Sequence, residues 1–355
     1  MRYVIIGAGA IGGAIGGRLH LAGHDVVLVA RGAHYAALRD KGLRLTTRDG
    51  VHELTIPVVD GPESIELTHD DVLILAVKTQ AATAALDAWA ARPVSKAEPR
   101  RAVGAGPHPA SGAGPRRAVG GGATAAEVLP LICAQNGVES ERIALRRFRR
   151  VYGMCVWLPA TFLVPGEITT HSAPYTGALS VGRYPSGADE TVERIAADLA
   201  SANFLAPVRT DVMRWKYAKL VSNLANAVEA ICGSGAGVEE QTLIARARAE
   251  AVAVLDKAGI ERVPADEEQA LRKGRVSFGP NDGSRGGGSS WQDLRRGNGS
   301  IEVDYLTGEI VLLGRLHDVP TPVNETLQRV ANEFARERRA PGSMTGAELT
   351  TLIDG

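Results

Sequence analysis

The chain has 355 residues, and its 40 basic and 40 acidic side chains give a formal net charge of zero at neutral pH. That length is enough for two hydrophobic cores, because single cores stop growing near about 250 to 300 residues. Balanced charge removes the overall field that draws proteins to nucleic acid or to anionic membranes, so we expect neither as a partner and favour a small molecule.

The first hundred residues carry the pattern of a parallel, doubly wound sheet. A β-branched run at residues 3–6 leads into a glycine turn, a small-residue helix and an apolar run at residues 25–30. Strand, turn, helix and strand within about 30 residues are typical of a βαβ unit. Apolar runs at residues 72–77 and 129–134 repeat the strand pattern. The sequence therefore predicts a Rossmann-type domain.

The glycine turn has the spacing of a dinucleotide-binding motif, G-x-G-x-x-G. Glycine permits the tight turn and the close approach of backbone to a pyrophosphate, whose charge then meets the N-terminus of the helix. A glycine-rich site for helix packing is the alternative, but the strand and helix on either side favour a cofactor. The residues predicted to bind it here are Gly7, Ala8, Gly9, Ala10, Ile11 and Gly12.

The end of the second strand indicates which dinucleotide binds. An NAD site typically carries Asp or Glu there for the ribose hydroxyls, whereas this strand ends in Ala30 and Arg31. The guanidinium fork of Arg31 suits a 2′-phosphate. We therefore expect NADP rather than NAD, with an ordinary surface arginine as the alternative.

Residues 92–124 interrupt the pattern with a stretch rich in Gly, Pro, Ala and Arg, in which PRRAVGAG is echoed by PRRAVGGG. Such a composition buries too little apolar surface to offset the entropy of chain ordering. We expect a disordered surface insertion, with a basic docking loop as the alternative. A second flexible loop is expected at residues 278–290.

The pattern changes after residue 150. Three β-rich stretches, a helix and a short strand are expected at residues 151–158, 165–172, 177–184, 189–200 and 206–209. From residue 211 onward the pattern is helical almost throughout. The sequence thus predicts an α/β fold with a Rossmann-type domain at 1–208 and an all-helical C-terminal domain at 209–355.

Cysteine usage points to a reducing compartment. Cys133, Cys155 and Cys232 are too few and too scattered for a disulfide framework, and no C-x-x-C pair suggests a metal site. The apolar opening segment resembles a secretory signal, but it is dense in glycine and its pattern continues to Arg31. No stretch approaches the roughly 20 apolar residues of a membrane span. We expect a cytoplasmic protein without a metal.

The helix that opens the C-terminal half carries polar groups on one face. A dinucleotide site implies hydride transfer, and the reduction of a carbonyl by hydride also needs a proton donor. A partly desolvated lysine can serve as that donor, because burial lowers its pKa. At about 100° per residue, Asn223 and Asn226 each fall within about 40° of Lys219. Lys216 lies about two turns from Asn223, so Lys219 is the better donor. The alternative is an ordinary lysine on a half-exposed helix.

Eight segments, in order along the chain, resemble those of ketopantoate reductases. They are VIIGAGAIGG, LAVKTQ, AQNGVES, PATFLVPG, WKYAKLVSNLAN, SSWQDL, SIEVDYLTGEI and VPTPVNETL. The resemblance covers nearly the whole chain apart from the insertion. It implies a cleft between a Rossmann domain and a helical domain, in which NADPH and a 2-oxo acid bind.

The resemblance also implies roles for particular residues. Lys219 matches the family's proton donor, and Glu302 matches an active-site glutamate whose carboxylate would orient Lys219. The implied substrate residues are Asn136, Asn223, Asn226 and Ser290. The implied cofactor residues beyond the glycine turn and Arg31 are Lys78, Asn136, Ala160 and Glu302. Ser290 follows from a gap-free alignment up to Glu302, so the choice between Ser289 and Ser290 stays open.

Two departures from the family lie on the substrate side. A further asparagine of some members has no counterpart in residues 231–237, and Trp291 replaces an apolar residue that is often Met. The expected function is NADPH-dependent reduction of 2-dehydropantoate to pantoate, a step of pantothenate biosynthesis, with a homodimer left open. The alternatives are a reductase of a different branched 2-oxo acid and a non-catalytic NADP sensor or scaffold.

Overall fold

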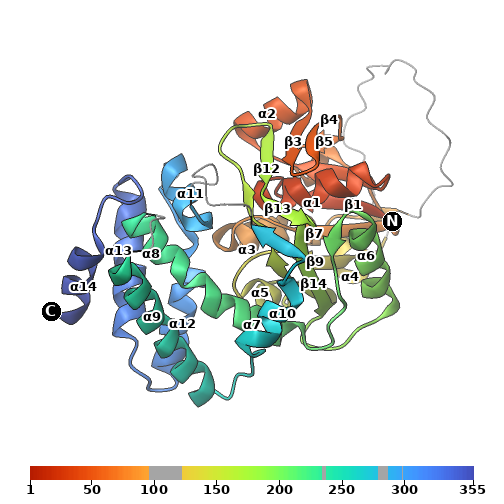
Figure 1. The fold of residues 1–355 in the computed structure, drawn as a ribbon. Coiled ribbons are helices and arrows are strands. Elements are labelled where there is room, and N and C mark those ends of the chain that lie inside the picture. Colours follow the sequence, from red (N-terminus) through yellow and green to blue (C-terminus); the bar gives the residue numbers. More distant parts are fainter. Residues whose placement is uncertain (96–121, 234–236, 279–286, 298) are drawn as a thin grey trace.

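The computed structural model describes residues 1–95, 122–233, 237–278, 287–297 and 299–355. The N-terminal half of the chain forms a part rich in strands, and the C-terminal half forms a bundle of helices (Figure 1). Most of the predicted insertion and of the predicted loop at 278–290 lies outside the described residues.

An eight-stranded sheet forms the centre of the N-terminal half. Its order is β15-β14-β10-β9-β7-β1-β2-β5, and all neighbours are parallel except β10 and β14. The strands are β1 (Arg2–Ile6), β2 (Asp25–Val29), β5 (Val58–Val59), β7 (Asp71–Leu75), β9 (Pro130–Cys133), β10 (Arg150–Trp157), β14 (Gly177–Arg183) and β15 (Phe204–Leu205). The doubly wound α/β fold is confirmed. The last strand was predicted at 206–209 and forms earlier, while Val208 makes an isolated bridge to Val181.

The strand order reverses at β1, and this positions a crevice. The chain runs from β1 through α1 (Ala10–Leu21) to β2 on one side, whereas β7 lies on the other side. Ile6 at the end of β1 is in register with both Val29 and Leu75. The turns that follow β1 and β7 therefore leave the sheet side by side, at the point where ligands bind in open α/β sheets.

Helices cover both faces of this sheet. One face packs against α1 and α6 (Glu190–Ser201) in a core that includes Ile15, Leu19 and Ile195. The other packs against α3 (Ala82–Ala90) and α5 (Ser140–Leu145), with Trp89 and Phe148 among its buried residues. Buried apolar strands between two helical layers explain why the strand segments read as continuous apolar runs.

A second, four-stranded sheet was not predicted, although the β-rich stretch expected at 165–172 contains one of its strands. Its order is β11-β12-β3-β4, and it comprises β3 (Leu43–Thr47), β4 (Gly50–Leu54), β11 (Ala160–Thr161) and β12 (Glu167–Thr170). β3 and β12 pair in parallel although more than a hundred residues separate them. This sheet contains Ala160, and it packs against α1 at Gly13, where an added Cβ would lie 2.9 Å from Ile168. Smaller elements are α2 (Gly32–Lys41), α4 (Ala125–Val128), β6 (Leu67–Thr68) and β8 (Val94–Ser95).

The C-terminal half is helical, as predicted. Its helices are α7 (Val212–Asn223), α8 (Ala225–Cys232), α9 (Val238–Lys257), α10 (Ala265–Arg272), α11 (Ser289–Arg296), α12 (Thr307–Leu316), α13 (Pro322–Arg336) and α14 (Gly346–Asp354). All of them except α10 share a core that includes Leu224, Leu255 and Phe334, whereas Leu271 of α10 packs in a separate cluster with Trp215. No helix in the described part of the chain is long and apolar enough to cross a bilayer.

The expectation of an all-helical C-terminal half needs one correction. A short strand, β16 (Val276–Phe278), pairs antiparallel with β13 (Ser172–Pro174) of the N-terminal half. This pairing joins segments about a hundred residues apart, which no local pattern reveals. The predicted domain boundary near residue 208 stays a prediction.

Candidate active site

A cavity of about 530 Å³ lies where the two halves meet. Its walls come from the glycine turn after β1, the loop after β7, the segment from β10 to β11, and helices α7, α8 and α11. The predicted site residues that line it are Gly7, Gly9, Ala10, Ile11, Lys78, Asn136, Ala160, Lys219, Asn223, Asn226 and Glu302. Residues from both halves of the sequence thus converge on one cavity.

The glycine turn requires glycine at particular positions. Gly7 has φ +103, and an added Cβ would lie 2.8 Å from the backbone nitrogen of Val77. A Cβ on Gly12 would lie 2.1 Å from the carbonyl oxygen of Gly7. Gly9, by contrast, faces the cavity, and as the N-cap of α1 it places no side chain over the first turn of the helix. This leaves the N–H groups of that turn available to an anion.

Ala8 and Gly12 shape the turn without lining the cavity. Ala8 is buried, and its carbonyl oxygen accepts a hydrogen bond from His34 Nε2 at 2.7 Å. His34 Nδ1 accepts from the Gly166 N–H at 3.0 Å, so the ring is a neutral tautomer with its proton on Nε2. Burial lowers the pKa of His34. This histidine therefore braces the turn against the second sheet.

Arg31 lies away from the lining of the cavity. It is the exposed N-cap residue of α2, directly after β2. The structure thus leaves its side chain accessible at the end of the second strand, and its predicted contact with a 2′-phosphate stays a prediction.

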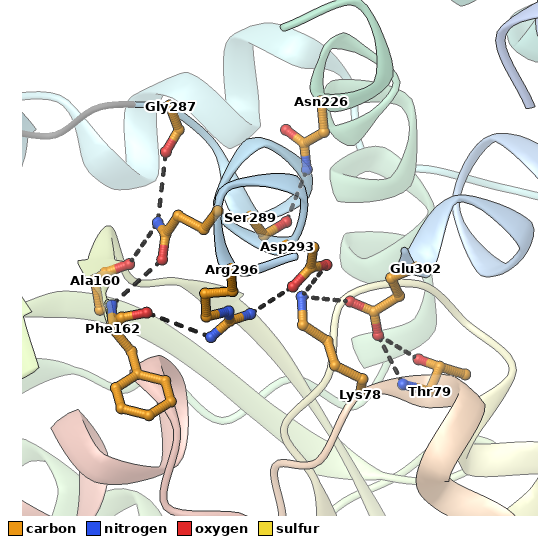
Figure 2. Close-up of polar contacts among 11 residues, drawn as sticks. Lys78, Thr79, Ala160, Phe162, Asn226, Gly287, Ser289, Asp293, Arg296 and Glu302 are labelled. Atoms are coloured by element: carbon orange, nitrogen blue, oxygen red, sulfur yellow. Dashed lines mark hydrogen bonds and ion pairs between the residues drawn. The ribbon is translucent and has the colours of Figure 1, made fainter. Parts of the chain in front are cut away.

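Lys219, Asn223 and Asn226 share one wall of the cavity. Helix α7 ends at Asn223 and α8 begins at Ala225, and Leu224 between them is itself in a helical conformation, so the helical repeat carries the shared face from one helix to the next. Asn226 Nδ2 donates to Ser289 Oγ at 3.2 Å (Figure 2). Among the described residues, the buried Asn223 Nδ2 and Asn136 Oδ1 find no hydrogen-bond partner. A donor and an acceptor are thereby available to a ligand.

The ammonium of Lys219 rests on an aromatic ring. Its Nζ lies 3.3 Å from the centroid of Trp157, a residue of β10 that also lines the cavity. The Arg272 guanidinium lies 3.8 Å from the same ring. A cation over the face of an indole is stabilised by the ring's quadrupole and held in place by it. Trp157 was not singled out in the sequence, because its only signal was an aromatic residue at a strand end.

Lys216 has a different environment from Lys219. It is 2% exposed, forms an ion pair with the fully buried Glu141, and donates to the Gln135 carbonyl oxygen at 3.1 Å. Burial raises the pKa of Glu141, and the charge of Lys216 acts against that shift. Lys216 is committed to a buried pair, which supports the choice of Lys219 as the cavity lysine.

Glu302 makes contacts that the sequence did not predict. Its Oε1 accepts from the N–H and the hydroxyl of Thr79, both at 2.8 Å, and its Oε2 accepts from Lys78 Nζ at 3.3 Å (Figure 2). Lys78 also pairs with Asp293 at 3.0 Å. Burial acts against the charge of Lys78, but Glu302 and Asp293 raise its pKa. The described contacts of Glu302 hold Lys78 and the loop after β7, rather than orienting Lys219 as predicted.

Helix α11 is fixed to the second sheet by two side chains. Gln292 Nε2 donates to the Ala160 carbonyl at 3.2 Å, and its Oε1 accepts from the Phe162 N–H at 3.3 Å. Arg296 donates to the Phe162 carbonyl at 3.3 Å and pairs with Asp293 at 2.5 Å (Figure 2). These contacts set the position of α11 over the cavity.

The prediction of Ser290 as the substrate serine is corrected by this placement. Ser289 lines the cavity and contacts Asn226, whereas Ser290 is 1% exposed and lies outside the lining. Neighbouring helical residues point about 100° apart, so only one of the two can face the cavity. The structure therefore favours Ser289 in the choice that the sequence left open. Trp291, the second departure from the family, packs against Gly287.

Comparisons with known proteins agree with this arrangement. Two family models match the chain, "Ketopantoate reductase PanE/ApbA" over residues 3–98 and "Ketopantoate reductase PanE/ApbA C terminal" over residues 211–335. A 2-dehydropantoate 2-reductase of Mesorhizobium japonicum is 31% identical over 345 residues, which cover 95% of this chain and 99% of that relative. One from Archaeoglobus fulgidus is 30% identical and covers 92% of this chain and 95% of its own length.

Solved structures share the fold. A PanE/ApbA family ketopantoate reductase from Ralstonia eutropha superposes with a TM-score of 0.71 at 23% identity, covering 96% of this chain and 100% of that chain. A D-mandelate dehydrogenase in a ternary structure with NADH and anilino(oxo)acetate gives a TM-score of 0.74 at 19% identity, with the same coverage.

Proposed function

The chain belongs to the ketopantoate reductase family, and from that premise we propose that it reduces 2-dehydropantoate to pantoate with NADPH. The observation that carries this proposal is the convergence of Lys219, Asn223 and Asn226 on a cavity whose other wall is a dinucleotide-type glycine turn. Carbonyl reduction requires a proton donor beside the hydride source, and an ammonium that faces a cofactor site fits that role, while the two amides can hold polar groups of a substrate.

The cofactor would lie along the glycine turn. The first turn of α1 would bind its pyrophosphate, and Gly7 and Gly9 would allow the close approach. Lys78 would meet the phosphates, Ala160 would contact the cofactor through its backbone, and Glu302 would bind it while holding Lys78 in place. When bound, the nicotinamide supplies the hydride that adds to the C2 carbonyl carbon.

The protein's own groups would then complete the reduction. The Lys219 ammonium polarises the C2 carbonyl oxygen and donates the proton that neutralises the developing alkoxide. Asn223, Asn226 and Ser289 hold the substrate's hydroxyl and carboxylate. Asn136 contributes to both sites, because it lines the cavity between the sheet and α7.

The assay that tests this function is NADPH oxidation with a panel of 2-oxo acids. We expect the highest kcat/KM with 2-dehydropantoate, with lower values for 2-oxoisovalerate and phenylglyoxylate. No turnover with any of them would contradict the proposal.

A second candidate is a reductase of another 2-oxo acid that is branched or carries a ring. Two observations favour it: Trp157 provides an aromatic wall, and the D-mandelate dehydrogenase shares the fold. Fold does not fix substrate, so the same panel decides. A higher kcat/KM for phenylglyoxylate than for 2-dehydropantoate would favour this candidate.

Arg31→Ala should affect KM for NADPH and KM for NADH differently. If the guanidinium binds the 2′-phosphate, the variant raises KM for NADPH by about 10-fold, equivalent to about 1.4 kcal/mol, and leaves KM for NADH nearly unchanged. The matched control is Arg39→Ala, since Arg39 is an exposed arginine on α2 that pairs with Asp40. Equal changes for the two cofactors would show that Arg31 does not discriminate between them.

A further inference from the structure

A second buried carboxylate lies behind the cavity wall that carries Lys219. Glu268, on α10, is 6% exposed, and its Oε2 accepts a hydrogen bond from Ser222 Oγ at 3.4 Å. Ser222 follows Lys219 by three residues on α7, so the two side chains are neighbours along the helix. Glu268 and Ser222 line a separate cavity, whereas Lys219 lines the substrate cavity. Helix α7 therefore links the carboxylate to the proposed proton donor.

Trp157 lies between these groups. Its ring carries Lys219 on its face, and its indole is among the groups that oppose the rise in the pKa of Glu268. Within the described structure, Trp157 Nε1 and Glu268 Oε1 are both buried without a completed hydrogen bond. A buried donor on Trp157 and a buried acceptor on Glu268 are therefore both open to a further polar contact.

Lys219 is the charged group that acts most strongly on Glu268. Burial raises the pKa of Glu268, and the positive charges of Lys219 and then Arg272 act against that shift. Electrostatic coupling is reciprocal, so the carboxylate stabilises the ammonium form of Lys219 to the same degree.

The other charged groups of the second cavity are mostly paired with one another. Arg214 contacts Glu261 and Arg262 contacts Asp256, while Arg248 donates to the Ser222 carbonyl. The cations that act on Glu268 are therefore chiefly Lys219 from α7 and Arg272 from its own helix.

We propose that Glu268 is a positioning residue for the reduction, which together with Trp157 and Ser222 holds the Lys219 side chain at the cavity wall and keeps it protonated. This inference rests on the proposed function, because it assigns a task to Glu268 only if Lys219 is the proton donor. A donor lysine at the wall of a substrate cavity is partly removed from water, and a neighbouring carboxylate favours its charged form.

The test is the pH dependence of kcat in Glu268→Gln, which keeps the size of the side chain and removes its charge. We expect the decline of kcat on the basic side to move to lower pH by about one unit. KM for NADPH should be unchanged, because Glu268 lies outside the cofactor wall. Glu267→Gln, the exposed neighbour on α10, is the matched control and should leave the profile in place.

Each outcome is decisive for one of the two proposals. A purely structural role would lower kcat or the melting temperature equally at all pH values, and an unmoved basic limb would overturn the inference. If Glu268→Gln does not fold, Glu268→Asp decides, because a displaced carboxylate should move the limb in the same direction by less. Absence of turnover in the unmodified protein would instead refute the proposed function.

Discussion

Lys219→Ala should lower kcat for 2-oxo acid reduction by about 100-fold or more, the usual size of a lost general acid. The ammonium is the cation that faces the cavity beside Asn223, and alanine can neither polarise the carbonyl oxygen nor donate a proton. Cofactor binding should survive, because the glycine turn lies on the opposite wall. The measurements are steady-state kcat and a fluorescence titration with NADPH.

The control for Lys219→Ala is Lys273→Ala, which removes an exposed lysine just after α10. It should leave kcat and NADPH binding unchanged. Equal losses in the two variants would point to a general effect of charge, and full turnover in Lys219→Ala would remove Lys219 from the mechanism.

The features that the sequence predicted well are local. The strands at residues 3–6 and 25–30 and the turn between them follow from short-range patterns, and β1, β2 and Gly7 lie where those patterns place them. The four-stranded sheet was missed because its central pair, β3 and β12, joins segments that are far apart in the sequence. Pairing of this kind depends on tertiary packing against α1, which no window of sequence contains.

The same distinction divides the candidate site. Lys219 and Asn223 share a helix, so their common face follows from the helical repeat, and both line the cavity. The contacts of Glu302 could not be predicted in this way, because its partners Lys78 and Thr79 are more than two hundred residues away. The choice between Ser289 and Ser290 stayed open for a local reason, since one residue of phase on α11 decides which serine faces the cavity.

Two lysines lie one turn apart on α7, and burial decides which of them serves the proposed reaction and which stabilises the fold. Lys219 faces a cavity and an aromatic ring, whereas Lys216 points into the protein toward Glu141. The two side chains leave the helix in directions that differ by a small angle, yet only Lys219 remains accessible to a substrate. Variants of the two residues should therefore have opposite consequences.

Lys216→Met should destabilise the protein by about 3 to 5 kcal/mol, because it leaves the Glu141 carboxylate buried without a compensating charge. Glu141 is fully buried, and Lys216 opposes the rise in its pKa that burial causes. Without Lys216 the folded-state pKa of Glu141 rises further above its unfolded value. A raised carboxyl pKa favours the folded state at low pH, so the loss should shrink near pH 5 and be largest above neutrality. Urea unfolding at pH 5 and pH 8 measures it.

The double variant Lys216→Met/Glu141→Gln should recover most of that loss, since it removes the stranded charge along with its partner. Lys257→Met, at an exposed position at the end of α9, is the control for exchanging a lysine for methionine and should change stability by less than about 0.5 kcal/mol. The folded fraction of Lys216→Met should keep a kcat within a few-fold of the unmodified protein, because Lys219 and the cavity are intact. A single variant with normal stability but lost turnover would reverse the assignment of the two lysines, since the buried pair would then serve catalysis rather than the fold.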